Sequence, residues 1–487
     1  MNRIRLLVFS ALALCGTVWG QAFADAVIGP ELDRRMQAGE CPCEVIVTFN
    51  NRSGLAKLDA LALEPLKLNV LPMAGLVAGN AEIDLIAGLA GVESIYFNAP
   101  LEYYNFNSGE ITDGHLAHDT LPYTGAGVTV AVLDSGIDAN HPDLAFGSKT
   151  VQNVKIVGDL GLLGGTTLFA EGVSNSDTTS GHGTHVAGTV AGTGVISADD
   201  PRRPYANDGI APGASLVGLG AGEGLSILYA LIGFDYAIAN QDRLGIDVIT
   251  NSWGCCDGAE FDPNDPINKA SFEAYRRGMV VLFAASNSGP AENTINKYAT
   301  PPWVISVAAG TPDAALADFS SRGVAGHRYK HPDIMAPGDG ITSTRAPGTA
   351  VGALGPVTDP IEYYPYYHTI SGTSMATPFV AGTTALLLEA NPQLSPDQVL
   401  EILMATAEPV EGRAFHEVGA GHVNVLDALL LAEDTAGERV HFLEGQTRWS
   451  ANGDWNRIDD ADSRLQLVGN WRARNDDGAL EGSVSWI

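Results

Sequence analysis

Residues 128–138 read VTVAVLDSGID, and this stretch decides the fold. Its first part, Val128 to Leu133, is an apolar run of strand type, which is typical of a strand buried on both faces of a parallel sheet. The run ends at Asp134. Ligands of open α/β sheets bind outside the carboxyl ends of the strands. The stretch therefore predicts a central parallel strand with a carboxylate at the ligand edge of its sheet.

The same pattern recurs along the chain. Further apolar runs of strand type follow at residues 215–219, 246–250, 279–285 and 304–308. Helical patterns at 225–240 and 268–277 lie between them, and Ser395-Pro396 supplies a cap and a first-turn proline for a late helix. We therefore expect an α/β domain over residues 106–432, built as a three-layer parallel sheet with helices on both faces.

Two smaller regions flank this domain. Residues 25–105 alternate strand patterns (43–49, 66–77 and 92–97) with helical ones (54–63 and 81–89). That order predicts a small α+β domain. Residues 433–487 hold four of the chain's seven tryptophans and short alternations such as 464–468, which predict a short β appendage. No repeat assigns a role to this tail.

The first residues have the pattern of a secretory signal. Arg3 and Arg5 precede an apolar run from Leu6 to Trp19, and Ala22-Phe23-Ala24 fits a cleavage site. The run is shorter than the ~20 residues that a membrane span needs. We expect residues 1–24 to be removed on export, which predicts a secreted or extracytoplasmic protein. A membrane anchor retained at this end is the alternative.

Charge and cysteine content exclude several classes of protein. The 57 acidic and 27 basic residues give a net charge of −30, which disfavours nucleic acid and anionic membranes as partners. Besides Cys15 in the signal, the cysteines form two close pairs, Cys41 with Cys43 and Cys255 with Cys256. Neither pair has the spacing of a zinc ribbon. A bridge this short closes almost no loop, so we expect both pairs to be incidental to stability.

Three segments carry side chains with catalytic chemistry. Asp134 ends the apolar strand, His182 lies in GHGTHVAG at 181–188, and Ser374 lies in GTSMATP at 372–378, at a predicted helix start. Alone, each has an ordinary explanation as a turn residue, a surface group or a helix cap. Together, a carboxylate, an imidazole and a hydroxyl make an activated nucleophile, and a helix start offers N–H groups to a developing oxyanion.

These motifs, in the order Asp, His, Ser, resemble those of the subtilisin-like serine proteases over about 120–432. The resemblance implies the following roles: Asp134 orients the base, His182 is the general base, Ser374 is the nucleophile, Asn287 donates to the oxyanion, and His185 is structural. A donor at the oxyanion position is worth roughly 3 to 4 kcal/mol in the transition state.

The resemblance also implies where a peptide substrate binds. Gly220-Ala221-Gly222 and Ser252-Trp253-Gly254 match the two strands between which the substrate adds as a third. The S1 site, which holds the P1 side chain before the cleaved bond, has Ser252 to Gly254 and Ala284-Ala285-Ser286 as its walls. Ser286 stands where glycine is usual. If its side chain fills the site, small or medium P1 residues are preferred; alternatively, it bonds to its own backbone. Acidic residues in this site would indicate basic substrates, but the sequence alone identifies none.

Two further expectations come with the resemblance. Residues 25–105 are similar to the family's inhibitory propeptide, which implies an exported zymogen that cuts itself between Tyr103 and Asn107. Asp143 is a candidate ligand for a stabilising calcium ion, and Asp199 and Asp200 are either further ligands or part of a solvated acidic loop.

The sequence thus predicts a secreted serine endopeptidase that acts on protein or peptide substrates. It needs no catalytic cofactor, and its own propeptide is its intramolecular inhibitor. Two alternatives remain: a maturation protease of narrow specificity, and a non-catalytic binding protein on the same fold.

Overall fold

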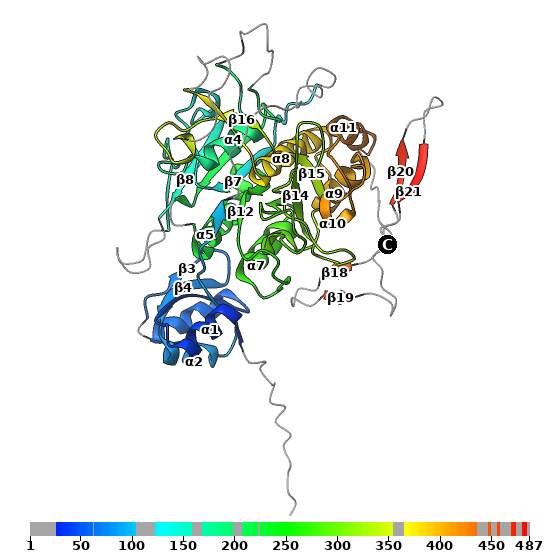
Figure 1. Cartoon of the computed structure of the whole chain (residues 1–487). Coiled ribbons are helices and arrows are strands. Elements are labelled where there is room, and N and C mark those ends of the chain that lie inside the picture. The colour runs from blue at the N-terminus through cyan, green and yellow to red at the C-terminus, as the bar shows by residue number, and fades with distance from the viewer. Residues whose placement is uncertain are drawn as a thin grey trace, which may run out of the picture.

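The computed structural model describes residues 26–61, 63–103, 122–157, 168–196, 198, 207–222, 225–353 and 365–435, together with the short strands of the tail (Figure 1). The predicted signal at 1–24, the acidic pair Asp199 and Asp200, and the alternation at 464–468 lie outside the described residues. Within the described ranges, every helix is too short or too polar to cross a bilayer.

The large domain is built on an eight-stranded sheet in the order β15-β14-β13-β11-β7-β10-β8-β9. In that order, the strands are Ile334–Pro337, Val304–Gly310, Val280–Ala284, Ile246–Asn251, Thr129–Asp134, Ser215–Gly220, Thr150–Ile156 and Phe169–Glu171. Neighbours pair in parallel except at one edge, where β9 runs antiparallel to β8. The predicted parallel sheet is confirmed, and the antiparallel edge strand is an addition to it.

Helices cover both faces of this sheet, as the apolar runs predict. On one face, α4 (His182–Ala191) and α8 (Thr373–Ala390) pack on Val130 and Val132 of β7. On the other face, α5 (Ile227–Ala239) and α7 (Pro266–Arg276) belong to the core that contains Ala131 and Leu133. Successive residues from Val130 to Leu133 of β7 therefore enter opposite cores, so this part of the strand carries no polar position. The remaining helices of this domain are α6 (Gln241–Leu244), α9 (Pro396–Thr406), α10 (Phe415–Val418) and α11 (Val425–Asp434).

Smaller elements complete the large domain and the tail. The large domain contains β12 (Trp253–Gly254), β16 (Ile341–Thr344), β17 (Tyr367–Ile370) and the 3₁₀ turns η2 (Pro142–Leu144), η4 (Lys297–Ala299) and η5 (Val351–Ala353). The predicted late helix is confirmed as α9: Pro396 is in its first turn, and the Ser395 hydroxyl accepts the Gln398 N–H. The tail forms the hairpins β18–β19 (Thr447–Trp449, Trp455–Arg457) and β20–β21 (Gly469–Ala473, Leu480–Val484), in agreement with the predicted β character.

The N-terminal domain has a five-stranded sheet in the order β1-β5-β2-β4-β3. In that order, its strands are Val27–Ile28, Val92–Phe97, Cys43–Phe49, Met73–Ala78 and Leu66–Lys67, and its helices are α1 (Pro30–Ala38) and α2 (Asn80–Ala87). The helix predicted at 54–63 is instead the 3₁₀ segment η1, Arg52–Leu61. The single strand predicted at 66–77 divides into β3 and β4. Sequence reasoning also missed β1 and α1.

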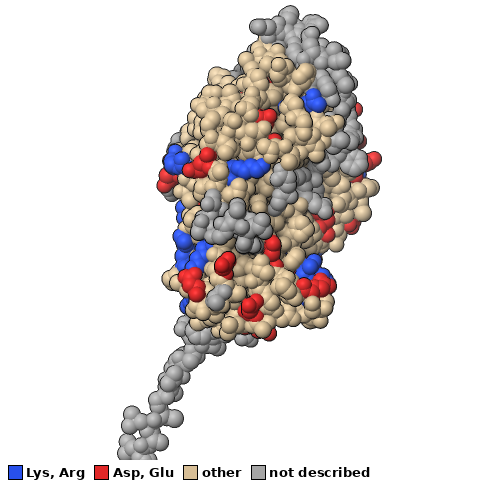
Figure 2. Space-filling view, turned by 90° about the vertical axis from the view of Figure 1, so that its left-hand side faces the viewer, with Lys and Arg blue, Asp and Glu red and all other residues tan. Residues whose placement is uncertain are grey.

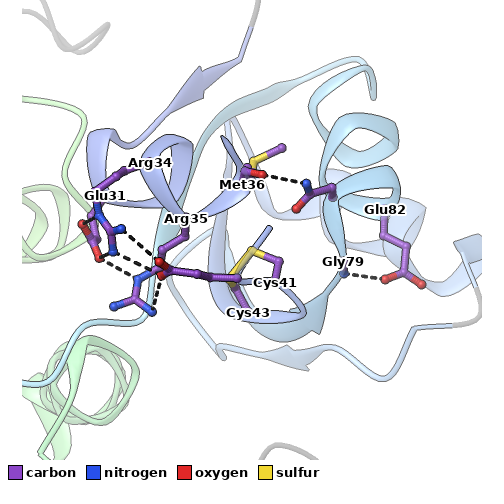
Figure 3. Close-up of a disulfide and its surroundings, with 10 residues drawn as sticks. Glu31, Arg34, Arg35, Met36, Cys41, Cys43, Gly79 and Glu82 are labelled. Atoms are coloured by element: carbon purple, nitrogen blue, oxygen red, sulfur yellow. Dashed lines mark hydrogen bonds and ion pairs between the residues drawn. A yellow bond between two sulfur atoms is a disulfide. The ribbon is translucent and has the colours of Figure 1, made fainter. Parts of the chain in front are cut away.

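Both close cysteine pairs form disulfide bonds. Figure 3 shows Cys41–Cys43 in the N-terminal domain, with the ion pairs of Glu31 to Arg34 and Arg35 on one side and the Glu82 cap of α2 on the other. The other bridge joins the adjacent residues Cys255 and Cys256, directly after β12. The expectation that these pairs are incidental to stability stays a prediction.

The N-terminal domain packs against α5 and α7 of the large domain (Figure 1). Leu66, Leu68 and Met73 of the N-terminal domain share one core with Leu228 and other α5 residues. The three N–H groups between β3 and β4, at Asn69, Val70 and Leu71, donate to the Asp235 carboxylate on α5 at 2.6, 2.5 and 2.8 Å. Burial raises the pKa of Asp235, and these donors act against that shift. The single predicted strand is interrupted here because its N–H groups bind another domain.

Candidate active site

The carboxyl end of β7 carries Asp134, which is fully buried. Its Oδ1 lies 2.7 Å from Nδ1 of His182 and accepts the Ser135 N–H at 2.7 Å. The other oxygen, Oδ2, has no hydrogen-bond partner among the described residues. Because a carboxylate can only accept, His182 carries its proton on Nδ1 and presents Nε2 as the basic nitrogen.

His182 is the first residue of α4, and the turn before it is held by a buried carboxylate. Asp177 accepts the N–H of Gly181 at 2.8 Å, and the N–H and hydroxyl of Thr184 at 3.0 and 2.6 Å. Gly181 has a φ of +81°, a backbone conformation that favours glycine. Ser135 Oγ accepts the Gly183 N–H at 2.7 Å, so the helix start is also tied to the end of β7. The imidazole is therefore held rigidly through its backbone as well as through Asp134.

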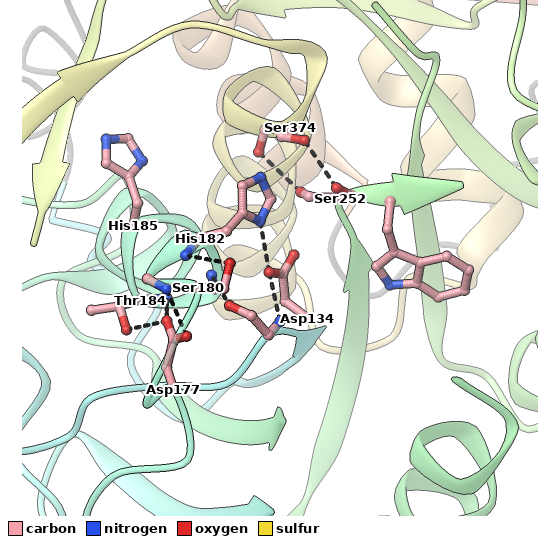
Figure 4. Close-up of polar contacts among 12 residues, drawn as sticks. Asp134, Asp177, Ser180, His182, Thr184, His185, Ser252 and Ser374 are labelled. Carbon is pink, nitrogen blue, oxygen red and sulfur yellow. Dashed lines mark hydrogen bonds and ion pairs between the residues drawn. The ribbon is translucent and has the colours of Figure 1, made fainter. Parts of the chain in front are cut away.

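Ser374 lies in the first turn of α8 and is fully buried. Figure 4 shows the His182 imidazole between the Asp134 carboxylate and the Ser374 side chain. The Ser374 hydroxyl donates to the Ser252 carbonyl at 2.9 Å, and the Ser252 hydroxyl donates back to the Ser374 carbonyl at 2.9 Å. The three predicted side chains thus meet, although they come from β7, α4 and α8. Hydrogen bonds of catalytic groups often tighten only when substrate binds.

Asn287, which follows β13, faces the same helix start. Its Oδ1 accepts the N–H and the hydroxyl of Thr373, both at 2.9 Å. Its Nδ2 is buried and has no hydrogen-bond partner among the described residues. A buried amide donor without a partner is rare because it loses the free energy of hydration. The arrangement offers a fixed N–H donor to an oxygen bound beside Ser374.

His185 lies one turn after His182 and has different surroundings. It is fully buried, and its Nε2 lies 3.1 Å from the Ile341 carbonyl and 3.3 Å from the His368 carbonyl. Burial lowers the pKa of His185 well below its ordinary value, with the nearby imidazoles adding to the effect. A neutral histidine that donates to two carbonyls fits the structural role expected for it.

The predicted substrate segments lie at the same edge of the sheet. Gly220 ends β10, and the N–H groups of Ala221 and Gly222 donate to the carbonyls of Asp134 and Ser135 at 2.7 and 3.2 Å. Across the site, β12 pairs antiparallel with β6 (Glu102–Tyr103), the last described segment of the N-terminal domain. The chain itself therefore supplies an added strand on one of the two segments predicted to bind a peptide.

The second predicted wall of the S1 site begins at Ala284, the last residue of β13. Ala285 and Ser286 come next, and both are fully buried. Ser286 has a φ of +93°, which explains why glycine suits this position. Its hydroxyl donates to Asp257 Oδ2 at 2.6 Å, not to its own main chain as one alternative proposed. Sequence reasoning missed Asp257. The sequence places it three residues after Gly254 but gives no other indication that it contacts the S1 site.

The Asp143 carboxylate is buried and carries two hydrogen bonds. Its Oδ2 accepts the Tyr367 hydroxyl at 2.6 Å, and its Oδ1 accepts the Val195 N–H at 3.0 Å. Burial raises the pKa of Asp208 to about 6, and the charge of Asp143 adds to this shift. In the described part of the chain, no three Asp, Glu, His or Cys side chains are grouped as a metal centre. Sequence reasoning also missed Asp208.

Comparisons with known proteins identify the family of the large domain. The model of the subtilase family matches residues 125–421. Serine protease AprX of Bacillus subtilis is 34% identical over 367 residues, which cover 72% of this chain and 76% of that protein. Subtilisin DY of Bacillus licheniformis is 34% identical over 312 residues, which cover 62% of this chain and 91% of that protein.

A solved structure extends the comparison to the fold. Fervidolysin of Fervidobacterium pennivorans, a keratinolytic enzyme related to subtilisin, aligns with a TM-score of 0.58 and 23% identity. The alignment covers 83% of this chain and 63% of fervidolysin, just under two thirds of that protein. At this identity the likeness supports the fold alone. The family match and the two relatives carry the assignment: this chain belongs to the subtilase family of serine endopeptidases.

Proposed function

We propose that this protein is an exported endopeptidase that is made as a zymogen and uses Asp134, His182 and Ser374 as its catalytic triad. The observation that carries the proposal is the buried 2.7 Å contact between Asp134 Oδ1 and His182 Nδ1, with Ser374 on the other side of the imidazole (Figure 4). The Asn287 amide, whose Nδ2 has no hydrogen-bond partner among the described residues, supports it independently. A non-catalytic relative has no need for either feature, which makes that alternative the weaker one.

The mechanism follows from these groups. His182 Nε2 takes the proton of Ser374 Oγ as this oxygen bonds to the scissile carbonyl carbon. Asn287 Nδ2 and the Ser374 N–H donate to the resulting oxyanion. His182 then gives its proton to the leaving amine, and the C–N bond breaks. In the second half, His182 takes a proton from water as the water oxygen bonds to the acyl carbon. His182 returns that proton to Ser374 Oγ as the ester bond breaks and the acid product leaves. Asp134 accepts the Nδ1–H of His182 and stabilises the imidazolium.

Protein or peptide substrates bind, in this proposal, as an added strand on β12. The pairing of β6 with β12 supports this mode, because its register places Glu102 opposite Gly254 and Tyr103 opposite Trp253. The Leu101 N–H also donates to the Leu225 carbonyl at 3.1 Å. The N-terminal domain thus reaches the substrate segment with its own chain, as an intramolecular inhibitor must.

Polar contacts along the domain interface support the same role. Lys269 pairs with Glu93 at 2.5 Å, the Ser94 hydroxyl donates to the Asn264 carbonyl at 3.3 Å, and the Tyr96 hydroxyl donates to the Asp262 carboxylate.

On the face shown in Figure 2, acidic and basic side chains of the described residues are interspersed. The domain boundaries at 105 and 432, and the removal of residues 1–24, stay predictions.

The register also predicts which bond is cut. The register places Tyr103, the last described residue of this segment, opposite Trp253. Trp253 directly follows Ser252, whose carbonyl accepts the Ser374 hydroxyl. We expect self-cleavage after Tyr104, within the range predicted from the sequence. N-terminal sequencing of the mature protein should begin at Asn105, and the mature protein should digest casein. A mature N-terminus far from Asn105 contradicts the register, whereas a correctly folded protein inert on casein contradicts the proposed activity.

We also propose that calcium stabilises the large domain. The described donor set fits calcium in kind, because Asp143 and Asp208 offer hard carboxylate oxygens. A β-bridge pairs Asp208 with Thr193, and Asp143 binds the Val195 N–H, so both carboxylates flank the same loop. A bound ion would offset the repulsion between their charges and hold this loop in place. No catalytic step needs it.

The calcium proposal predicts a chelator-dependent melting temperature. At an ion concentration 100-fold above Kd, binding adds about 2.7 kcal/mol, which raises the Tm of a domain this size by roughly 5 °C. Asp208→Asn should lose that gain, whereas Asp313→Asn, a change at an exposed carboxylate, should keep it. Melting curves of the wild type that coincide with and without chelator exclude the site.

A further inference from the structure

The loop after β12 brings a carboxylate against the predicted S1 site. Asp257 lies three residues beyond Gly254, the end of one predicted wall. Its Oδ2 accepts the hydroxyl of Ser286, the last residue of the other wall, at 2.6 Å. It also accepts the hydroxyl of Ser288 at 2.5 Å. The carboxylate therefore connects the two walls between which a P1 side chain must enter, and Ser286 lies directly before Asn287.

The loop that carries Asp257 is well anchored. The Cys255–Cys256 disulfide lies directly before it, and the Gly258 N–H donates to the Ile295 carbonyl at 2.8 Å. The nearby cation Lys330 donates to the Gly258 carbonyl, to Glu260 and to Asn293 at 2.8, 2.5 and 3.0 Å. Asp257 itself is exposed, so an incoming substrate can reach this residue. A charge fixed before binding loses less entropy when it pairs.

Building on the proposed endopeptidase function, we infer that Asp257 selects the P1 residue and that the preferred P1 side chain is cationic, arginine or lysine. The Ser286 hydroxyl holds this carboxylate in position. If Ser286 only filled the S1 site, its hydroxyl would do no more than reduce the volume open to the P1 side chain. A flexible cationic side chain can extend to Asp257 and pair with its carboxylate, whereas an aromatic ring has no such partner there. The net charge of −30 favours the same substrates over longer distances.

The proposed P1 preference does not extend to the chain's own processing segment. Residues 68–148 contain neither lysine nor arginine, so self-cleavage cannot use a cationic P1 residue. It does not need one, because β6 is already paired with β12 and the reaction is unimolecular. Selection by Asp257 applies to substrates that arrive from solution. This selection would give the protease a narrower range of substrates than an apolar S1 site would.

The test compares peptides that differ only in the charge at P1. Peptide p-nitroanilides with arginine and with its uncharged isostere citrulline, and with lysine and norleucine, are assayed for kcat/KM. We expect the wild type to favour arginine over citrulline at least tenfold, with a ratio that falls as salt rises. Asp257→Asn should bring the ratio to near one, and Asp313→Asn, the same change of charge on another exposed loop, should leave it unchanged. Ser286→Ala and Ser288→Ala, which remove the anchoring donors, should give intermediate ratios.

The outcomes separate this inference from the function on which it rests. A wild type that cleaves arginine and citrulline peptides equally, or an Asp257→Asn variant that keeps the full ratio while it digests casein, overturns the role of Asp257. A preference for alanine over both cationic and aromatic P1 residues also overturns it and favours a filled site. A folded protein that is inert on casein and does not react with a serine-directed fluorophosphonate refutes the endopeptidase function instead.

Discussion

Ser374→Ala should give a folded protein that neither digests casein nor releases its N-terminal domain. The same hydroxyl is the nucleophile for both reactions in the proposed mechanism, so both are lost together. Removing the nucleophile of subtilisin, a member of this family, lowers kcat by about 10⁶, and we expect a loss of that order here. Casein hydrolysis and N-terminal sequencing of the purified protein measure the two effects.

The substitution tests chemistry more than stability. The Ser374 hydroxyl donates one hydrogen bond, to the Ser252 carbonyl, so its removal costs about 1 kcal/mol of folding free energy. Thr384→Ala is the matched control, because it removes a hydroxyl that donates to the Val380 carbonyl on the same helix and should keep full activity. A Ser374→Ala protein that still matures after purification from a protease-deficient host contradicts the proposal. Cleavage of that variant by added wild type would show that its processing segment stays accessible.

The parts of this fold that sequence predicts well are those in which local pattern and tertiary environment agree. The strand Thr129–Asp134 could be predicted because both of its faces are buried, which leaves apolar side chains at all four positions from Val130 to Leu133. The helix Pro396–Thr406 could be predicted because its cap and first-turn proline are local signals. The three catalytic candidates were found through motifs, each of which joins a reactive side chain to the turn that presents it.

The missed features depend on partners distant in the chain. The interruption between β3 and β4 follows from Asp235, some 165 residues away, which binds the N–H groups there. The pairing of β6 with β12 joins two-residue strands, which have no periodicity to detect. Asp257 and Asp208 looked like ordinary loop acids. Their neighbours, Ser286 for one and Asp143 for the other, come from other segments, so only the fold reveals what they can do.

Asn287→Leu should lower kcat by about 10² to 10³ and leave KM nearly unchanged. Leucine keeps the volume of the side chain and removes its N–H donor. The Nδ2 group is already buried without a hydrogen-bond partner among the described residues, so it bears the cost of desolvation before substrate arrives. A donor of this kind gains most when the carbonyl oxygen becomes negative, which stabilises the transition state more than the bound substrate. Kinetics on one peptide substrate separate kcat from KM.

The orientation of this amide supplies a second and finer test. Asn287 Oδ1 accepts two donors from Thr373, its hydroxyl and its N–H, and these fix which way Nδ2 points. Thr373→Val removes the hydroxyl and keeps the N–H, so kcat should fall by a smaller factor than in Asn287→Leu. If Thr373 acts by orienting the Asn287 amide, the double variant should have the same kcat as Asn287→Leu alone, because an amide that is absent cannot be misoriented. Multiplicative losses in the double variant, or an Asn287→Leu variant that raises only KM, would mean that Asn287 binds substrate and does not stabilise the oxyanion.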